Sequence, residues 1–302
     1  MFDLIIVGAG PAGLTAGIYA KRAGLNALIL DKSGAGGQVL STYEVDNYPG
    51  LLHISGMELG ERFGSHLEQL GISVTNEEVI EIEVDGDIKR VVTNKENYES
   101  KGIVLCLGAS HLQLGIEGEN ELVGAGVSYC ATCDGAFYKG ANVAVVGGGD
   151  VALEDALYLA RTSAKVYLIH RRNTFRGTKS LFEAVQKCSN IEIVYDSVVE
   201  KLKGVEEGEL SGLVLRNVTN NKNTDIELEG MFVAIGTRPN TDWLPECIDR
   251  DEKGYVIAAE DCRTNIPNVY VCGDARRKPL RQIVSAVCDG AVAVNSFAED
   301  MN

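Results

Sequence analysis

The chain has 302 residues, in which 28 lysines and arginines against 43 aspartates and glutamates give a net charge of −15. This charge argues against nucleic acid or an anionic membrane surface as a main partner, and no apolar run reaches the ~18 residues of a membrane span. With 45% hydrophobic and 24% charged residues, the composition is that of a folded, cytoplasmic, enzyme-sized protein of one large domain or two.

The first predicted elements form a β-α-β unit. A β-branched strand over residues 2–7 leads into Gly-Ala-Gly-Pro-Ala-Gly at 8–13, a helix over about 11–23 and a strand over 27–31. Gly8 allows the tight turn, Gly10 lets a pyrophosphate approach the backbone, and Gly13 lets helix and strand pack closely. The helix N-terminus offers free N–H groups to the phosphates. For a single copy, a glycine-rich turn without a ligand remains the alternative.

The same pattern occurs again later in the chain. A strand from 142 leads into Gly-Gly-Gly-Asp-Val-Ala at 147–152, followed by a helix over about 150–161 and a strand over 165–169. Two copies in the same strand–turn–helix–strand context favour two nucleotide sites over two turns without ligands.

The two copies differ where the second strand ends, which is the position that selects the nucleotide. Asp31 in the first copy suits a free ribose hydroxyl, as in the adenosine of FAD or NAD. The equivalent residue, 139 positions later, is His170, followed by Arg171, Arg172 and Arg176. Guanidinium groups in place of a carboxylate suit a 2′-phosphate and therefore NADP. The alternative is a solvated basic strand end without a ligand.

A pair of closely spaced cysteines precedes the second copy. Cys130 and Cys133 enclose Ala-Thr and are followed by Asp134. At the first turn of a helix, such a pair can form a disulfide whose thiolate form is reactive, and Asp134 could move the proton that exchange requires. A zinc site would need a second pair of ligands, which the sequence does not offer. A buried, inert pair is the other alternative.

Together, these motifs resemble the low-molecular-weight bacterial NADPH-dependent thioredoxin reductases, class II of the pyridine nucleotide-disulfide oxidoreductases. The resemblance covers essentially the whole chain, and CATCDG directly before the second glycine turn is its most specific part. Further matching segments are Gly36-Gly37-Gln38, Val45-Asp46-Asn47-Tyr48-Pro49-Gly50 and Cys272-Gly273-Asp274.

The resemblance implies an α/β fold of two Rossmann-like dinucleotide-binding domains. The NADPH domain, residues 115–242, carries the redox-active CxxC and is inserted into a discontinuous FAD domain, residues 1–114 and 243–302. Family members form homodimers and rotate the inserted domain during turnover, with hinge candidates here at 112–118 and 236–242.

The resemblance also implies which residues bind the two cofactors. The FAD residues are Gly8, Gly10, Pro11, Ala12, Gly13, Asp31, Lys32, Gly36, Gly37, Gln38, Asn47, Gly273, Asp274, Arg281, Gln282 and Ile283. The NADPH residues are Gly147, Gly149, Asp150, Val151, Ala152, His170, Arg171, Arg172 and Arg176. No metal is implied.

The implied activity is a thioredoxin-disulfide reductase. Hydride passes from NADPH to FAD, electrons pass to the Cys130–Cys133 disulfide, and the dithiol reduces thioredoxin or a thioredoxin-like protein. Cys133 matches the thiol nearest the flavin, Cys130 the thiol that attacks the partner, and Asp134 the acid/base. Ala125 stands where relatives often carry a basic residue, which leaves partner recognition open.

Two other classes of function are compatible with some of these motifs. One is a related flavin disulfide reductase or oxidase with a different thiol partner or electron donor. A ferredoxin-fed version should lack the second glycine turn and the arginine cluster, both of which are present. The other is a non-catalytic nucleotide-binding or redox-sensing module, which would have little need of Asp134 beside an intact CxxC.

Overall fold

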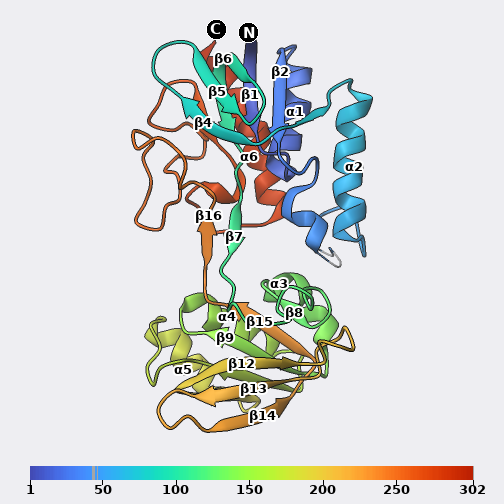
Figure 1. Cartoon of the computed structure of the whole chain (residues 1–302), viewed down its shortest axis with the longest axis vertical. Helices are drawn as coiled ribbons and strands as arrows, with labels where there is room; N and C mark the ends of the chain where they lie inside the picture. The colour runs from blue at the N-terminus through green and yellow to red at the C-terminus, as the bar shows by residue number, and fades with distance from the viewer. Residues whose placement is uncertain (43–44, 46, 302) are drawn as a thin grey trace. The chain divides into compact units, whose positions relative to one another are not determined.

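A computed structural model describes residues 1–42, 45 and 47–301, and it divides into two units (Figure 1). Unit 1 contains residues 1–110 and 238–302, and unit 2 contains residues 111–237. The boundaries expected from the sequence lie four and five residues farther along the chain. Asp46 of the segment 45–50 lies outside the described residues.

Unit 1 alternates strands and helices and then returns to complete its sheet near the C-terminus. Its first part contains β1 (Phe2–Val7), α1 (Pro11–Arg22), β2 (Ala27–Asp31), the 3₁₀ turn η1 (Gly37–Ser41), α2 (Gly56–Gln69), β3 (Val74–Asn76), β4 (Val79–Glu83), β5 (Lys89–Thr93) and β6 (Asn97–Leu105). Its second part contains β17 (Val269–Val271), η3 (Gly273–Ala275) and α6 (Ile283–Asp300).

The sheet of unit 1 has a parallel core and an antiparallel extension. Its strand order is β3-β2-β1-β6-β5-β4, and β17 pairs with the C-terminal half of β6. Residues of β1 alternate between the two faces. Leu4 and Ile6 pack beneath the helices α1 and α6, whereas Ile5 and Val7 pack on the opposite face. Both faces are therefore covered, as parallel sheets require.

The register of this sheet brings two distant turns together. Val7 of β1 and Val271 of β17 both pair with Leu105 of β6, on its two sides. The turns that begin at Gly8 and Cys272 therefore leave the sheet at the same carboxyl edge. Open α/β sheets bind their ligands at this edge.

Unit 2 is built around a second parallel sheet. Before and within that sheet lie β8 (Val127–Ser128), α3 (Ala131–Asp134), η2 (Gly135–Tyr138), β9 (Asn142–Gly147), α4 (Asp150–Leu159), β10 (Lys165–Ile169), α5 (Lys179–Lys187) and β11 (Ile191–Val194). The remaining strands are β12 (Ser197–Lys203), β13 (Gly212–Asn217), β14 (Asn223–Glu227) and β15 (Gly230–Ala234).

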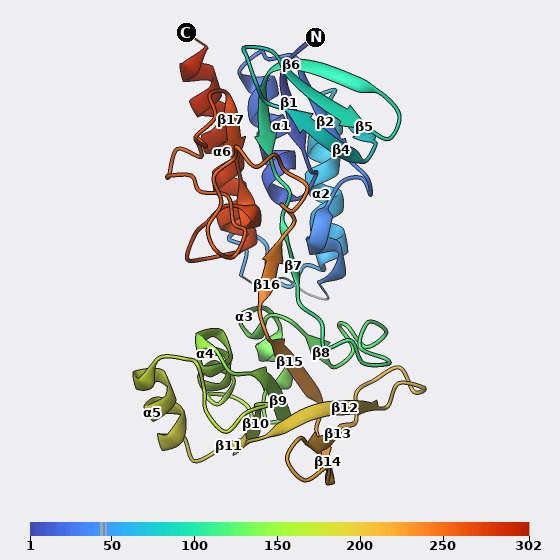
Figure 2. The ribbon, with the colours of Figure 1, turned by 60° about the vertical axis from the view of Figure 1, so that its left-hand side comes forward.

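The two faces of this second sheet are covered by different elements (Figure 2). The sheet has the order β11-β10-β9-β15-β8, and β12, β13 and β14 form a separate antiparallel sheet. One face packs against α4 and α5 through Leu153, Ala156 and Val185, and the other packs against the antiparallel sheet. The predicted α/β class with two Rossmann-type units is confirmed.

The chain crosses between the units twice, and the crossings pair with each other. β7 (Ala109–His111) and β16 (Thr237–Pro239) form a two-stranded ribbon. Pairing continues beyond it, since Leu112 N–H donates to the carbonyl oxygen of Gly236 at 3.0 Å. These segments overlap the expected hinges, and motion at them stays a prediction. Among the described residues, no helix combines the length and the apolar character needed to cross a membrane.

A buried charged cluster joins α6 to the loop after β17. Asp289 is 5% exposed, and its carboxylate accepts hydrogen bonds from the Gly273 N–H, the Arg276 guanidinium and the Lys278 ammonium at 2.9–3.1 Å. Arg276 also donates to the carbonyl oxygen of Ala259 at 3.0 Å. The carboxylate accepts from two cations and one amide, and its charge offsets one of the two buried positive charges.

Replacing Asp289 with alanine would leave two cations buried without their counter-ion. We expect Asp289→Ala to lower the free energy of unfolding of unit 1 by about 3–5 kcal/mol. Urea unfolding followed by tryptophan fluorescence measures this, since the single tryptophan, Trp243, packs in unit 1. Glu58→Ala, which removes an exposed ion pair with Arg62, is the control and should cost less than ~1 kcal/mol. Equal losses in the two variants would contradict the assignment.

Candidate functional site

The three glycines of the first turn differ in the space beside them, and only Gly10 has room for another group. Gly8 has φ +103° and faces the Cys106 carbonyl so closely that a Cβ would collide with it. A Cβ on Gly13 would collide with the carbonyl oxygen of Gly8. A Cβ on Gly10, by contrast, would meet only the Gly37 Cα, at 4.0 Å. The turn therefore forms an open cradle at the N-terminus of α1, where N–H groups bind anions.

Asp31, at the end of β2, fixes this turn through hydrogen bonds to backbone N–H groups. Its Oδ2 accepts the Ala9 N–H at 2.8 Å, and its Oδ1 accepts the N–H groups of Ser33 and Gly34 at 2.7 and 3.1 Å. A carboxylate has about four acceptor positions, so the three bonds leave capacity on Oδ2 for one further donor. The geometry fits a ribose hydroxyl as that donor.

The loop after β2 closes the cradle from the other side. The Gly36 N–H donates to the carbonyl oxygen of Ala9 at 2.8 Å, and the Gln38 amide donates to the carbonyl oxygen of Ala109. Lys32 points outward into an exposed ion pair with Glu78 at 3.4 Å. The loop is thus fixed by hydrogen bonds to backbone carbonyl groups, while the Lys32 side chain makes an ion pair at the surface.

The turn after β17 supplies a buried acceptor. Gly273 approaches α1, because a Cβ on it would lie 3.2 Å from the Ala12 Cβ. In the next residue, the Asp274 Oδ1 is buried and has no hydrogen-bond partner among the described residues. Burial raises the pKa of Asp274, and the cations of Lys278 and Arg281 oppose this effect. Because buried polar atoms normally have hydrogen-bond partners, this oxygen is suited to accept a hydrogen bond from a bound ligand.

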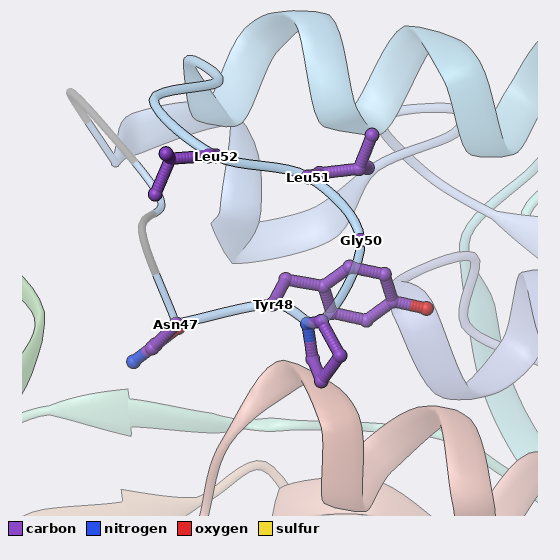
Figure 3. A pocket seen from close by; sticks show the side chains of 6 residues that line it. Asn47, Tyr48, Gly50, Leu51 and Leu52 are labelled. Carbon is purple, nitrogen blue, oxygen red and sulfur yellow. The ribbon is translucent and has the colours of Figure 1, made fainter.

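Two further segments of unit 1 meet beside this turn. The Asn47 amide donates to the Gln282 Oε1 at 3.1 Å, and Ile283 at the start of α6 packs on the apolar cluster that contains Val39. The Arg281 guanidinium lies 3.9 Å from the centre of the Tyr255 ring. Residues 47–52 line a pocket of about 320 Å³ (Figure 3).

A dinucleotide such as FAD fits this arrangement. The open position at Gly10, the spare acceptor on Asp31 and the orphaned Asp274 oxygen all belong to unit 1 and lie on segments that leave its carboxyl edge. Pro11 occupies the first position of α1 and Ala12 the second, where the missing N–H of proline costs nothing.

The second glycine turn repeats the same design in unit 2. A Cβ on Gly147 would collide with the carbonyl oxygen of Ala234, whereas a Cβ on Gly149 would meet no atom within 4 Å. Ala152 is fully buried beneath the turn, and Val151 is 58% exposed beside it. The Asp150 Oδ1 accepts the N–H and the hydroxyl of Thr178 at 2.6 and 2.8 Å, so this side chain joins α4 to the start of α5.

The His170 side chain lies inside the protein. It is 5% exposed, its ring stacks on Phe175, and its Nε2 lies 3.0 Å from the carbonyl oxygen of Thr174. A Cβ on Gly148 would collide with the ring. Burial lowers the pKa of His170, which favours the neutral form. The His170 ring therefore packs directly against Gly148 and supports the second glycine turn.

Three arginines follow His170 at the surface. Arg171, Arg172 and Arg176 are exposed, and no described carboxylate lies within ion-pair distance of any of them. The Arg176 N–H donates to the carbonyl oxygen of Gly148 at 2.8 Å, which ties the arginine loop to the glycine turn. Unpaired guanidinium groups next to a phosphate cradle are suited to bind a further phosphate.

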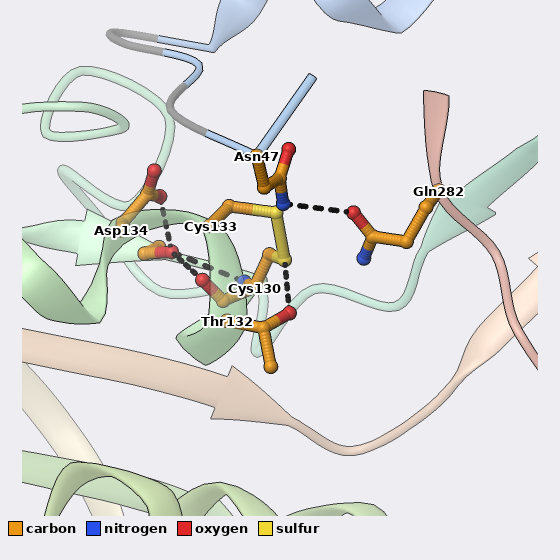
Figure 4. The surroundings of a disulfide bond; sticks show 7 residues. Asn47, Cys130, Thr132, Cys133, Asp134 and Gln282 are labelled. Carbon is orange, nitrogen blue, oxygen red and sulfur yellow. Dashed lines mark hydrogen bonds between the residues drawn. A yellow bond between two sulfur atoms is a disulfide. The ribbon is translucent and has the colours of Figure 1, made fainter. Parts of the chain in front are cut away.

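Cys130 and Cys133 form a disulfide, as their spacing predicts (Figure 4). Cys130 is the N-cap of α3, and its Sγ lies 3.4 Å from the Thr132 Oγ1. Cys133 and Asp134 are partly buried, whereas Thr132 is exposed. The described residues contain no cluster of potential metal ligands.

Two groups that belong to no sequence motif hold this segment in place. The Ser128 hydroxyl donates to the Asp134 Oδ2 at 2.6 Å and accepts the Cys130 N–H at 3.1 Å. Glu119, 2% exposed, accepts the Tyr129 hydroxyl and the N–H groups of Leu114 and Gly115 at 2.8–2.9 Å. Only the short spacing between Ser128 and Asp134 is visible in the sequence.

The sequence profile of the pyridine nucleotide-disulphide oxidoreductases matches residues 2–290. The chain belongs to this family. Among its members, the thioredoxin reductase of Listeria monocytogenes is 38% identical over 294 residues, which are 97% of this chain and 92% of that protein.

Solved structures of family members have the same fold. The thioredoxin reductase of Streptococcus pyogenes, 38% identical, superposes with a TM-score of 0.95 over 100% of this chain and 98% of its own. That of Lactococcus lactis, in a state described as the FR conformation, is 37% identical and covers 99% of both chains, with a TM-score of 0.68.

One carboxyl group on α4 makes the stability of this oxidoreductase depend on pH. Burial, with a smaller contribution from Glu154, raises the pKa of Asp155 to about 7. A raised carboxyl pKa means that folding favours the protonated form, so stability falls as pH rises from about 4 to about 7. We expect Asp155→Asn to raise the melting temperature at pH 8 and to have little effect at pH 4. Thermal unfolding across this range measures the effect.

The neighbouring Glu154→Gln variant is the control, because Glu154 is exposed. Its melting temperature should follow that of the unsubstituted protein much more closely. Parallel pH curves for the unsubstituted protein and Asp155→Asn would show that Asp155 does not titrate in this range.

Proposed function

We propose that this protein is an NADPH-dependent thioredoxin-disulfide reductase of the cytoplasm that uses FAD and acts as a homodimer. The observation that carries the proposal is the Cys130–Cys133 disulfide at the start of α3, with Asp134 in the same helix and a nucleotide turn in the same unit. Relatives that match nearly the whole chain, share its fold and are named thioredoxin reductases support it.

FAD would be held by unit 1. The Gly10 cradle would receive the pyrophosphate, Asp31 a ribose hydroxyl, and Asp274 a hydroxyl of the flavin side chain. When bound, FAD supplies a carrier that takes two electrons from a nicotinamide and delivers them to a disulfide. The protein's part is to orient these groups and to place a reducible disulfide within reach.

NADPH would be held by unit 2. The open position at Gly149 would receive its pyrophosphate at the N-terminus of α4. Arg171, Arg172 and Arg176 would bind the 2′-phosphate, which distinguishes NADPH from NADH. His170 contributes to this site by supporting Gly148, and its buried ring leaves the phosphate to the three arginines.

The reduced cysteine pair would transfer its electrons by thiol–disulfide exchange. The Cys130 thiolate attacks one sulfur of the partner disulfide, so that a Cys130–partner bond forms and the partner's own disulfide breaks. The leaving partner thiolate takes a proton from Asp134. The Cys133 thiolate then attacks Cys130, which restores the Cys130–Cys133 disulfide and releases the second partner thiolate for protonation.

The nucleotide turn and the cysteine pair both belong to unit 2, so we infer that they use the flavin in turn and that unit 2 rotates between two orientations. The two solved relatives support this inference. At 38% and 37% identity and nearly complete coverage, their TM-scores are 0.95 and 0.68. Two relatives of nearly equal identity to this chain thus give different TM-scores over nearly the whole chain, and the second is described as being in the FR conformation.

An anaerobic titration tests the proposed function. NADPH should bleach the flavin absorbance of the purified protein rapidly, NADH should do so poorly, and oxidised thioredoxin should restore it. In Cys130→Ser, the flavin should still be reduced, but transfer to thioredoxin should fall by at least 10³-fold, since the attacking thiolate is absent. Failure of NADPH to bleach bound FAD would rule out the proposed donor, and normal thioredoxin reduction by Cys130→Ser would rule out the proposed thiol.

The arginine loop predicts nucleotide specificity. Replacing Arg171 and Arg172 together with alanine should weaken NADPH binding by about 10²-fold, because two charge-assisted contacts to phosphate are lost, and should leave NADH binding nearly unchanged. Fluorescence titration with each nucleotide measures both dissociation constants. Equal weakening for the two nucleotides would refute the assignment of the 2′-phosphate to this loop.

Arg161→Ala is the matched control for this pair. Arg161 is exposed and belongs to the same unit. It follows the C-terminal end of α4, so it lies about 15 Å from the turn at the other end of that helix. Its removal should change neither dissociation constant.

A further inference from the structure

The Ser128 side chain is buried and directly contacts the redox segment, residues 130–134. It ends the short strand β8, is 4% exposed, and precedes Cys130 by two residues. β8 is the edge strand of the unit 2 sheet and pairs with β15, with Ser128 opposite Phe232. The backbone of Ser128 is therefore anchored in the sheet, and its hydroxyl projects from a rigid base.

This hydroxyl contacts three atoms of the redox segment. It lies 2.6 Å from the Asp134 Oδ2, 3.1 Å from the Cys130 backbone nitrogen and 3.4 Å from the Cys130 carbonyl oxygen. The nitrogen can only donate to it. The carboxylate oxygen and the carbonyl oxygen are alternative acceptors for its single proton, and the shorter distance favours the carboxylate.

These contacts have different consequences in the two protonation states of Asp134. When Asp134 is ionised, the Ser128 hydroxyl donates to Oδ2 and stabilises the charge. When Oδ2 carries a proton, that proton can be donated to Ser128, and the Ser128 proton can turn to the Cys130 carbonyl. The Ser128 hydroxyl has a partner in both states, so a change in the protonation of Asp134 Oδ2 does not leave that hydroxyl unpaired.

We propose that Ser128 is a positioning residue for proton transfer in this protein, which holds the Asp134 carboxyl group beside the cysteine pair in both of its protonation states. The proposal rests on the proposed function, because only disulfide exchange requires Asp134 to cycle. Each exchange with a partner disulfide protonates two partner sulfurs, so Asp134 must deliver and recover protons in every turnover.

Other ionisable groups face Asp134 as well. Tyr138 of η2 and Glu209 lie close enough that Asp134 and Glu209 contribute, after burial, to raising the pKa of Tyr138 to about 12. Tyr138 therefore stays neutral at physiological pH. Glu209 lies in the loop before β13. Titration of Tyr138 therefore does not account for a pH effect specific to Ser128.

The test compares the pH dependence of thioredoxin reduction in Ser128 variants. Asp134→Asn identifies the limb of the profile that belongs to Asp134, because that limb disappears in this variant. In Ser128→Ala, the same limb should move to higher pH by about one unit, since a hydrogen bond to the carboxylate is lost. The rate of disulfide exchange should fall about tenfold, while the rate of flavin reduction by NADPH stays unchanged.

Two pairs of variants separate positioning from folding. Ser128→Thr and Ser128→Val have the same shape, and only the first keeps the hydroxyl, so the first should retain the original limb and the second should show the shift. Ser197→Ala removes another buried serine hydroxyl of unit 2, bonded to the Tyr195 carbonyl at 2.8 Å. It should leave the limb in place.

The outcomes distinguish the two proposals. An unshifted limb in Ser128→Val, or identical shifts in Ser128→Val and Ser128→Thr, would overturn the role of Ser128 while leaving the reductase activity standing. Absence of NADPH-dependent thioredoxin reduction in the unsubstituted holoenzyme would instead overturn the proposed function itself.

Discussion

The site in unit 1 depends on one close approach, that of helix α1 to the ends of strands β1 and β6. Gly13 lies directly against the carbonyl of Gly8, and Gly8 lies against that of Cys106. Any side chain at either glycine would push the helix away from the sheet edge. The helix could then neither present its N–H groups to a phosphate nor meet α6, whose Gly290 has no room for a Cβ against Ala12. The absence of a Cβ atom at Gly8, Gly13 and Gly290 therefore lets the sheet edge, α1 and α6 pack closely and leaves the N-terminus of α1 open.

Asp31 and His170 lie at equivalent positions, at the end of the second strand of each β-α-β unit. Both hold a glycine turn in place, but with different side-chain chemistry. Asp31 holds the first turn through a hydrogen bond to the Ala9 N–H, and His170 holds the second by filling the space beneath Gly148. One support is ionic and accepts from the backbone, and the other is a stacked ring. The first leaves an acceptor for the proposed ribose hydroxyl, whereas the second leaves the proposed contact with a 2′-phosphate to the arginines that follow.

Much of this could be predicted from local sequence. The glycine turns, their flanking strands and the helices at Pro11 and Asp150 were located to within two residues at either end, because spacing and β-branched runs determine them over short distances. The burial of His170, the contact of Ser128 with Asp134 and the buried Asp274 oxygen could not be. Each depends on segments that the fold brings together. The antiparallel sheet β12–β14 was also not predicted, although its strands carry charged residues, such as Glu200 and Lys201 of β12, that the central parallel strand β9 lacks.

The division of unit 1 between two distant parts of the chain has a consequence for its synthesis. Unit 2 is continuous, so it can fold as soon as residues 111–237 have left the ribosome. Unit 1 must wait for residues 238–302, which bring β17 and α6. At about 5–20 residues per second this takes roughly 3–13 seconds. During that interval the face of the first sheet that α6 will cover, with Leu4, Ile6 and Val104, is without its partner. Unit 2 can therefore be folded while the sheet of unit 1 still exposes an apolar face, which is the kind of surface that makes folding intermediates prone to aggregate.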